Sequence, residues 1–283
     1  MNIKKTEFKY TWHEAIELLR NDPVHKDLIF NSYLTLNLLE NAKRFASGDE
    51  FNEVLKIIKN TFPSAKTVMD MPGGNGIATY AFALNGFEVT TVEPDPSNDV
   101  GRGAINFVLQ ESKLVSNVVE AFGENLPFDD FSFDIVYVRQ GLHHAADLKK
   151  MIKEIYRVLA PNGILIATRE HVVDDYDASL NNFLNSQVDH MLYGGENAFT
   201  LEDYVSSISQ GGLSMLEVIK PFQSNINMFP SNVNNIELKL LNSMAGKVLS
   251  LILPSSMVIN IGLWYLNGRK SPGRLYSFVA KKD

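Results

Sequence analysis

The sequence predicts an α/β fold built on a mainly parallel β-sheet. From Lys66 onward, short apolar runs alternate with helical patterns, as in consecutive βαβ units. The first run is followed at once by a glycine-rich turn, residues 73–76, and a helix, and the second run ends at the acid Glu93. A strand, a glycine turn, a helix, a second strand and an acid in this order are typical of α/β sheets that bind a nucleoside.

The expected strands are the apolar runs bounded by turn residues. They cover residues 67–70, 87–93, 116–120, 134–138, 164–168, 214–220 and 275–281. Helical patterns between them cover residues 77–85, 98–112, 148–159 and 201–210. Two longer stretches, residues 171–199 and 222–273, are insertions. Because ligands of open α/β sheets bind beyond the carboxyl ends of the strands, we expect both insertions to roof that edge.

The N-terminal part has a different rhythm. Residues 12–19, 27–44 and 51–59 show helical apolar spacing, and Asn21-Asp22-Pro23 interrupts the first two. We therefore expect residues 1–62 to form a helical cap and residues 63–283 to form the main domain with its insertions.

Composition excludes several classes of protein. A chain of 283 residues that is 45% hydrophobic and 21% charged can bury a full core. A net charge of −7 without a basic cluster argues against a nucleic-acid partner, and the absence of cysteine excludes disulfides, thiolate metal sites and cysteine nucleophiles. The first residues show no apolar signal core, so we expect a cytoplasmic protein.

The stretch 248–266 is nearly all apolar, but Pro254, Ser255, Ser256 and Asn260 interrupt it. A membrane-spanning helix needs about 20 largely unbroken apolar residues. We expect two short buried helices, bent at Leu253–Pro254, that serve as a pocket lid or a dimer face. Contact with a membrane surface or a lipid substrate is the alternative.

Two acids indicate which nucleoside binds. The dinucleotide fingerprint G-x-G-x-x-G fails at its third position, which is Thr79. Asp70 precedes the glycines and would repel a pyrophosphate, but it suits a ligand that carries an ammonium group, such as the amino-acid end of S-adenosylmethionine. The carboxylate of Glu93 can accept hydrogen bonds from both hydroxyls of a ribose.

At these residues the chain resembles the class I S-adenosylmethionine-dependent methyltransferases, most of all their small-molecule branch. The resemblance covers residues 66–212 and 274–280. It rests on the motifs Val68-Met-Asp-x-Pro-Gly-Gly-x-Gly76, Val92-Glu-Pro-Asp95, Gly123-Glu-Asn-Leu-Pro-Phe128, Phe133-Asp-Ile-Val136, Gln140-Gly-Leu-His-His144 and Arg157-Val-Leu-Ala-Pro-Asn-Gly163. It implies a Rossmann-like sheet of seven strands, mainly parallel with an antiparallel last strand, and helices on both faces.

The resemblance also implies the residues that bind the cofactor. They are Asp70, Gly73, Gly74, Gly76, Glu93, Pro94, Phe122, Gly123, Glu124, Arg139 and Gln140. Two positions depart from the family pattern. Pro72 stands where the first glycine of the turn is usual, and Phe122 stands where many relatives carry an Asp that binds the adenine. We expect Phe122 to stack on the adenine ring. Arg139 either holds the cofactor or pairs with a neighbouring acid.

His143 and His144 are the candidate catalytic bases, because they follow the fourth strand directly and histidine titrates near neutral pH. The candidate substrate residues lie after the fifth strand and in the first insertion. They are Glu170, His171, His190, Tyr193, Glu196 and Asn197. Gly194-Gly195 between them forms either a turn or part of the substrate site. The loose spacing of these histidines favours metal-independent transfer.

The expected function is methyl transfer from S-adenosylmethionine to a small molecule, with a hydroxyl as the favoured acceptor because a hydroxyl needs a base. One alternative is a protein that binds the cofactor without transferring its methyl group. The other is a nicotinamide-dependent oxidoreductase, which Asp70 and Thr79 oppose. The sequence leaves open whether the chain is a monomer or a homodimer.

Overall fold

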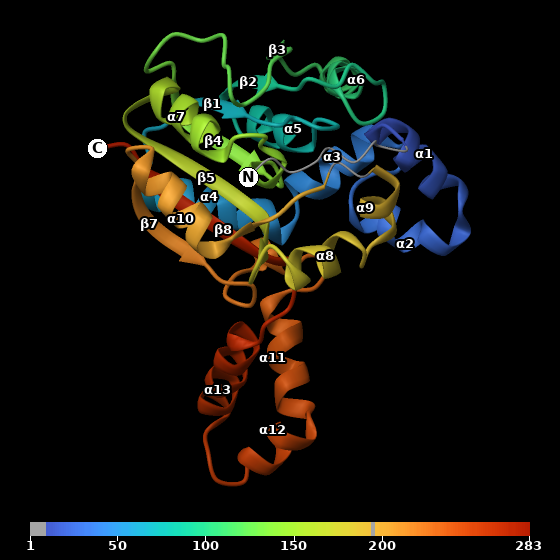
Figure 1. The fold of residues 1–283 in the computed structure, drawn as a ribbon, viewed down its shortest axis with the longest axis vertical. Coiled ribbons are helices and arrows are strands. Elements are labelled where there is room, and N and C mark those ends of the chain that lie inside the picture. The colour runs from blue at the N-terminus through green and yellow to red at the C-terminus, as the bar shows by residue number, and fades with distance from the viewer. Residues whose placement is uncertain (1–9, 194–195) are drawn as a thin grey trace.

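The computed structural model describes residues 10–193 and 196–283 and shows a central sheet between two layers of helices (Figure 1). The strands are β1 (Thr67–Asp70), β2 (Glu88–Val92), β3 (Ser116–Val119), β4 (Phe133–Arg139), β5 (Leu159–Val173), β6 (Phe199–Thr200), β7 (Ser214–Ile219) and β8 (Arg274–Lys281). Their order is β3-β2-β1-β4-β5-β8-β7, with β6 paired to β5. Pairing is parallel except along β8, which runs antiparallel to β5 and β7. The predicted fold class is confirmed, and β6 adds a strand to the seven that we expected.

Helices cover both faces of the sheet, as predicted. One layer contains α3 (Leu38–Ala46), α4 (Asp49–Thr61), α5 (Ile77–Leu84) and α6 (Arg102–Ser112), and the other contains α7 (Leu148–Val158) and α10 (Leu201–Gln210). Successive residues of a strand point to opposite faces. Val68 of β1 accordingly packs in the core between the sheet and the layer that contains α3 to α6, and Met69 packs in the core between the sheet and the layer that contains α7 and α10.

The predicted helix 27–44 is wrong as a single element. The segment is divided into two helices, α2 (Lys26–Asn31) and α3. Asn37 caps the start of α3, where its side chain accepts a hydrogen bond from the backbone N–H of Glu40 at 3.3 Å. Between the two helices, the carbonyl of Tyr33 accepts a hydrogen bond from Asn75 Nδ2 at 2.6 Å. A carbonyl inside a regular helix is already engaged, so this bond to the glycine turn favours the break. Because α3 and α4 share a core with β1, a domain boundary at residue 62 stays a prediction.

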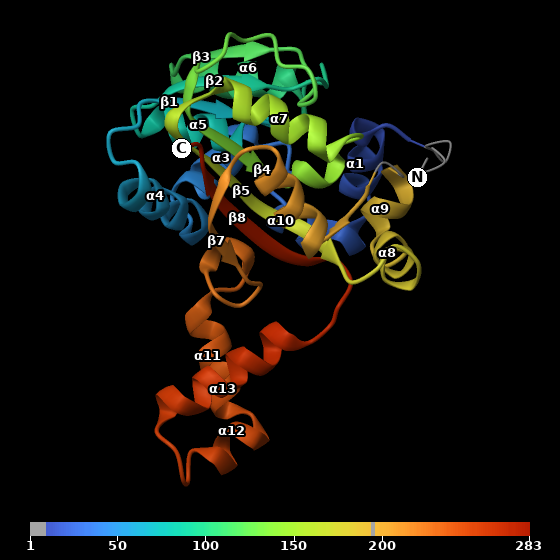
Figure 2. The same cartoon turned by 60° about the vertical axis from the view of Figure 1, so that its left-hand side comes forward.

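The two insertions differ from each other. The first forms α8 (Ala178–Leu184) and α9 (Val188–Tyr193), and α9 packs beside α1 (Trp12–Asn21), where the rings of Tyr193 and Trp12 lie 5.4 Å apart. The second forms α11 (Val233–Asn242), α12 (Met244–Leu249) and α13 (Ser255–Gly268). Figures 1 and 2 show these three helices projecting away from the sheet.

The expectation that residues 248–266 are buried is therefore wrong. The bend at Leu253–Pro254 is confirmed, since α12 ends at Leu249 and α13 begins at Ser255. The side chains beside the bend are nevertheless in solvent, with Leu251 84% exposed. Within the described residues, no helix combines the length and apolar character needed to cross a membrane.

Candidate active site

A cavity of about 570 Å³ opens at the carboxyl ends of β1, β2 and β4, where the sequence places the ligand. Most of the predicted site residues line it. They are Asp70, Gly73, Gly74, Glu93, Pro94, Phe122, Gly123, Glu124, Arg139, Gln140, His143, His144, His171, His190, Tyr193 and Glu196. Gly76, Glu170 and Asn197 were predicted to bind ligands but are not among the lining residues. Gly194-Gly195 lie outside the described residues, and the second insertion does not roof the cavity, since no lining residue falls within 222–273.

Asp70 presents a buried acceptor to this cavity. Its Oδ2 accepts a hydrogen bond from the Thr79 hydroxyl at 2.7 Å, whereas its Oδ1 has no hydrogen-bond partner among the described residues. Burial raises the pKa of Asp70 to about 7. An ammonium group of a ligand would satisfy Oδ1 and restore the charged form. Thr79 is thus the residue that orients the acid, which explains a hydroxyl at the position where a dinucleotide-binding turn needs a small residue.

The three glycines of the turn serve different purposes. A Cβ at Gly73 would lie 2.3 Å from Thr91 Cγ2, so this glycine is required by packing against β2. Gly76 has φ +85° and its Cβ would lie 3.1 Å from the Ile105 backbone, which makes it a packing position too. At Gly74, φ is +53° and no atom lies within 4 Å of a built Cβ. The open approach for a ligand is therefore at Gly74.

Glu93 is held by the same turn. Its Oε2 accepts the N–H of Gly74 at 2.7 Å and its Oε1 accepts the N–H of Asp95 at 2.8 Å. Burial raises the pKa of Glu93 to about 7, although these two hydrogen bonds lower it. A carboxylate has about four acceptor positions, so two remain for the hydroxyls of a ribose.

The loop after β3 forms the rim of the cavity. Phe122 is 68% exposed there, so its ring is accessible to a ligand. Glu124 Oε1 accepts the N–H groups of Ala146 at 2.8 Å and Asp147 at 3.3 Å, which ties this loop to the start of α7. Cofactor contacts by Phe122, Gly123 and Glu124 stay predictions.

Arg139 pairs with an acid, the alternative that the sequence left open. Its Nε and Nη2 donate to the two oxygens of Glu50 at 2.6 and 3.2 Å. Glu50 is the second residue of α4 and is buried, and Arg169 Nη1 lies 3.9 Å from the same carboxylate. Glu50 has no signal in the sequence, because an acid in the first turn of a helix is ordinary and its partner lies 89 residues away.

Glu170 has a different place from the one predicted. β5 continues to Val173, so Glu170 and His171 lie within the strand and not after it. The strand is irregular at Arg169, whose φ is 60°, a bulge that redirects the following side chain. Glu170 is fully buried behind the loop after β4, where its carboxylate accepts the N–H groups of Gly141, Leu142 and His143 at 3.0 to 3.2 Å. It holds that loop and does not contact the cavity.

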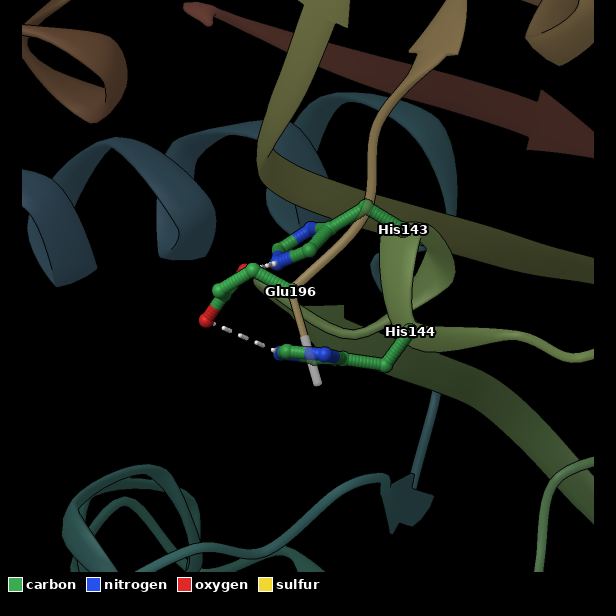
Figure 3. Close-up of side chains that lie close together, drawn as sticks. All are labelled: His143, His144 and Glu196. Atoms are coloured by element: carbon green, nitrogen blue, oxygen red, sulfur yellow. Dashed lines mark ion pairs between the residues drawn. The ribbon is translucent and has the colours of Figure 1, made fainter. Parts of the chain in front are cut away.

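The same carboxylate orients His143. His143 Nδ1 lies 2.7 Å from Glu170 Oε2. In the tautomer that donates Nδ1–H to the ionised carboxylate, Nε2 is the acceptor nitrogen. Burial, together with His144 and His190, holds the pKa of His143 well below its usual range. Figure 3 shows Nε2 directed toward Glu196, with 3.5 Å between Nε2 and Glu196 Oε2. A neutral imidazole with one nitrogen fixed by a carboxylate is the arrangement of a general base.

The remaining predicted residues form one wall of the cavity. The His171 ring lies 4.9 Å from that of His143 and 5.9 Å from that of His190. His144 Nε2 lies 3.9 Å from Glu196 Oε1, and burial raises the pKa of Glu196 to about 7. His143, His144 and Glu196 each offer a ligand atom within 4.8 Å of the others, a spacing that a divalent cation can bridge. Metal-independent transfer therefore stays a prediction.

Comparisons with known proteins relate this chain to methyltransferases. Residues 69–167 match the family model described as "Methyltransferase domain". An uncharacterized methyltransferase, YcgJ of Bacillus subtilis, is 31% identical over 148 residues, which is 50% of this chain and 54% of that protein. The ubiquinone/menaquinone biosynthesis C-methyltransferase UbiE of Klebsiella pneumoniae is 35% identical over 103 residues, 36% of this chain and 41% of that protein. The chain thus spans about half or less of the length of these curated relatives.

A solved structure extends the similarity in fold to nearly the whole chain. Geranyl diphosphate methyltransferase in complex with S-adenosylmethionine superposes with a TM-score of 0.58 at 14% identity, covering 98% of this chain and 97% of that one. At that identity the match shows the fold alone. Residues 69–167, which run from β1 into β5, thus match a methyltransferase domain, and the solved structure adds that nearly the whole chain shares the fold of a methyltransferase.

Proposed function

We propose that the chain transfers a methyl group from S-adenosylmethionine to a hydroxyl group of a small molecule. The observation that carries this proposal is His143 Nε2, an acceptor nitrogen in the same cavity as Asp70 and Glu93. When bound, the cofactor supplies an electrophilic methyl group on a positively charged sulfur. Glu93 would hold its ribose, and Asp70 Oδ1 with the Gly74 turn would hold its amino-acid end.

The chain's own groups would then act on the acceptor. His143 Nε2 would take the proton of the hydroxyl as its oxygen forms a bond to the methyl carbon, and Glu170 would stabilise the imidazolium that results. A positioned base typically contributes ~10²–10⁴-fold to the rate, and alignment of the reacting atoms contributes much of the rest. His171, His190, Tyr193 and Glu196, on the same wall as His143, would contact the acceptor.

The named relatives keep a second acceptor open. UbiE is a C-methyltransferase and the solved neighbour methylates geranyl diphosphate by name, so a carbon acceptor is the alternative within the same class. The buried His143–Glu170 pair suits a hydroxyl, whose proton has to leave during the transfer. A carbon acceptor also loses a proton after it is methylated, so the acceptor panel described below distinguishes the two.

The first experiment is calorimetric titration of the chain with S-adenosylmethionine, S-adenosylhomocysteine and NADH. Loss of the Glu93 hydrogen bonds in Glu93→Ala should weaken binding of both S-adenosyl compounds about 100-fold, as two charge-assisted hydrogen bonds imply. Glu88→Ala, an exposed acid on the same strand, is the matched control. Binding of NADH alone would refute the proposal in favour of an oxidoreductase.

The second experiment separates transfer from silent binding. S-adenosylhomocysteine formation is measured with panels of hydroxylated, amine and carbon acceptors for the wild type and His143→Ala. Turnover of a hydroxylated acceptor that His143→Ala lowers at least 100-fold, with unchanged cofactor affinity, supports the base. Cofactor binding without turnover of any panel would support a protein that binds S-adenosylmethionine and transfers nothing.

A further inference from the structure

The helices α11, α12 and α13, together called the arm (residues 233–268), expose apolar side chains that do not line the cavity and take no part in the proposed methyl transfer. Nine large hydrophobic side chains of the arm are more than 40% exposed: Leu238, Met244, Val248, Leu251, Ile252, Met257, Ile261, Trp264 and Tyr265. The arm projects from the α/β body in both views, and the loop between α12 and α13 forms its far end (Figures 1 and 2). Large hydrophobic side chains exposed together on one structural unit mark a candidate interaction site.

The spacing of these residues shows that the patch is organised. On α13, Met257, Ile261, Trp264 and Tyr265 stand at positions i, i+4, i+7 and i+8, which lie on one face of a helix. The other face is turned inward: Val258 is buried and a Cβ on Gly262 would lie 2.7 Å from Leu240 of α11. The helix is therefore packed on one side and apolar and exposed on the other.

The same spacing recurs at the far end of the arm. Met244, Val248, Leu251 and Ile252 also stand at i, i+4, i+7 and i+8, across α12 and the turn that follows it. Leu251 and Ile252 are 84% and 77% exposed. The most exposed aliphatic side chains are thus at or beside the part of the arm that lies farthest from the sheet.

Charge indicates what covers this surface. The arm and the five residues that follow it, 233–273, carry four basic side chains, Lys239, Lys247, Arg269 and Lys270, against the single acid Glu237. The net charge is +1 for the arm and +3 for this longer segment, whereas the whole chain carries −7, so the residues outside 233–273 carry −10. An arm that is both apolar and positive is complementary to an anionic lipid surface and is repelled by the like-charged arm of a second copy.

The aromatic residues fit the same partner. Trp264 is 78% exposed, and the Arg269 guanidinium lies 6.0 Å from the ring of Tyr265. Aromatic rings next to basic side chains are typical of segments at the boundary between lipid headgroups and acyl chains. With 14 residues, α13 is ~21 Å long, too short for a hydrocarbon core about 30 Å thick. Contact with lipid would be at the surface of one leaflet.

We propose that the arm docks the chain on an anionic membrane surface, inserting the Leu251–Ile252 turn and the Trp264 face among the lipids while the acidic body stays in water. This proposal is independent of the methyl acceptor, because it concerns a surface that does not line the cavity.

The test is co-sedimentation of the full chain with vesicles. Phosphatidylcholine vesicles containing about 30% phosphatidylglycerol should bind the chain at least tenfold more tightly than phosphatidylcholine alone, and 0.5 M salt should reduce that difference. The double variant Leu251→Ser/Ile252→Ser should lower binding at least tenfold, and Lys247→Gln/Lys270→Gln should remove most of the salt dependence. Val115→Ser, an 85% exposed aliphatic residue on the body, is the matched control and should bind as the wild type does.

Two further readouts decide among the outcomes. Trp12→Phe leaves Trp264 as the single tryptophan, and its emission should shift to the blue on anionic vesicles. Light scattering after gel filtration reports self-association. Absence of vesicle binding overturns the proposal, and if the chain is then a dimer that Leu251→Ser/Ile252→Ser separates, the occupant is a second copy. Vesicle binding that neither arm variant lowers also overturns it, since another surface would be responsible.

Discussion

Replacing Glu93 by Gln should stabilise the unliganded chain at alkaline pH while weakening its binding of S-adenosylmethionine. Glu93 is 5% exposed, and burial raises its pKa from 4.5 to about 7. A carboxyl whose pKa is raised by folding contributes its full stability below the unfolded value and loses that contribution as the pH rises through the folded value. The window here runs from about pH 4.5 to pH 7.

The magnitude follows from the same two values. At about 1.4 kcal/mol for each pH unit, keeping Glu93 ionised in the folded chain costs at most about 3 kcal/mol above pH 7. Gln carries no charge and does not have this cost. The side-chain NH2 of Gln, however, would face the backbone N–H of Gly74 or Asp95, and two donors cannot form a hydrogen bond. The energetic cost of this mismatch does not change with pH. The diagnostic quantity is therefore the change in ΔΔG between two pH values.

The assay is urea unfolding of wild type and Glu93→Gln at pH 5 and pH 8 without ligand. The free energy of unfolding of the variant, relative to wild type, should rise by about 2–3 kcal/mol from pH 5 to pH 8. Glu88→Gln on the same strand is exposed and should show no such change. An equal ΔΔG at both pH values would refute the argument that Glu93 is held as a desolvated acid for a ligand.

Three other predictions concern the neighbouring groups. Glu170→Gln should lower kcat about 100-fold or more without changing the affinity for S-adenosylmethionine, because His143 loses the carboxylate that fixes Nδ1–H; an unchanged kcat in steady-state assays would show that the pair is only structural. Glu50→Gln should destabilise the chain by about 3–5 kcal/mol in urea unfolding, because Arg139 stays buried without its charge partner, and a loss below about 1 kcal/mol would contradict this. Dialysis against EDTA should leave turnover unchanged; turnover that falls and returns with added Mg²⁺ or Zn²⁺ would assign His143, His144 and Glu196 to a metal centre.

The parts of the site that the sequence predicts best are those made by neighbours in the chain. Asp70, the glycine turn and Glu93 belong to one βα unit followed by a strand, and parallel pairing of β1 with β2 brings the two acids to the same edge. His143 likewise follows β4 directly. Local periodicity and turn chemistry determine such positions, so the cavity lies where the sequence places it.

The contacts that give these residues their chemistry are long-range. Glu50 contacts Arg139 from a helix 89 residues earlier in the chain. Glu170 contacts His143 because β5 continues beyond its predicted apolar run and a bulge at Arg169 redirects the side chain that follows. The break before α3 depends on a bond between Tyr33 and Asn75. No pattern of neighbouring residues records these contacts, since each forms only when distant segments meet.

The sequence by itself determined the order of the main strands, the edge where the cavity lies and the position of the candidate catalytic histidine, because hydrophobic periodicity and glycine turns act over a few residues. Tertiary structure alone decided whether an apolar segment is core or surface. Residues 248–266 have the composition of a buried lid, yet most of them are exposed, because α13 buries only Val258 and packs against Leu240 of α11 at Gly262. Burial depends on what packs against a segment, and composition cannot specify that.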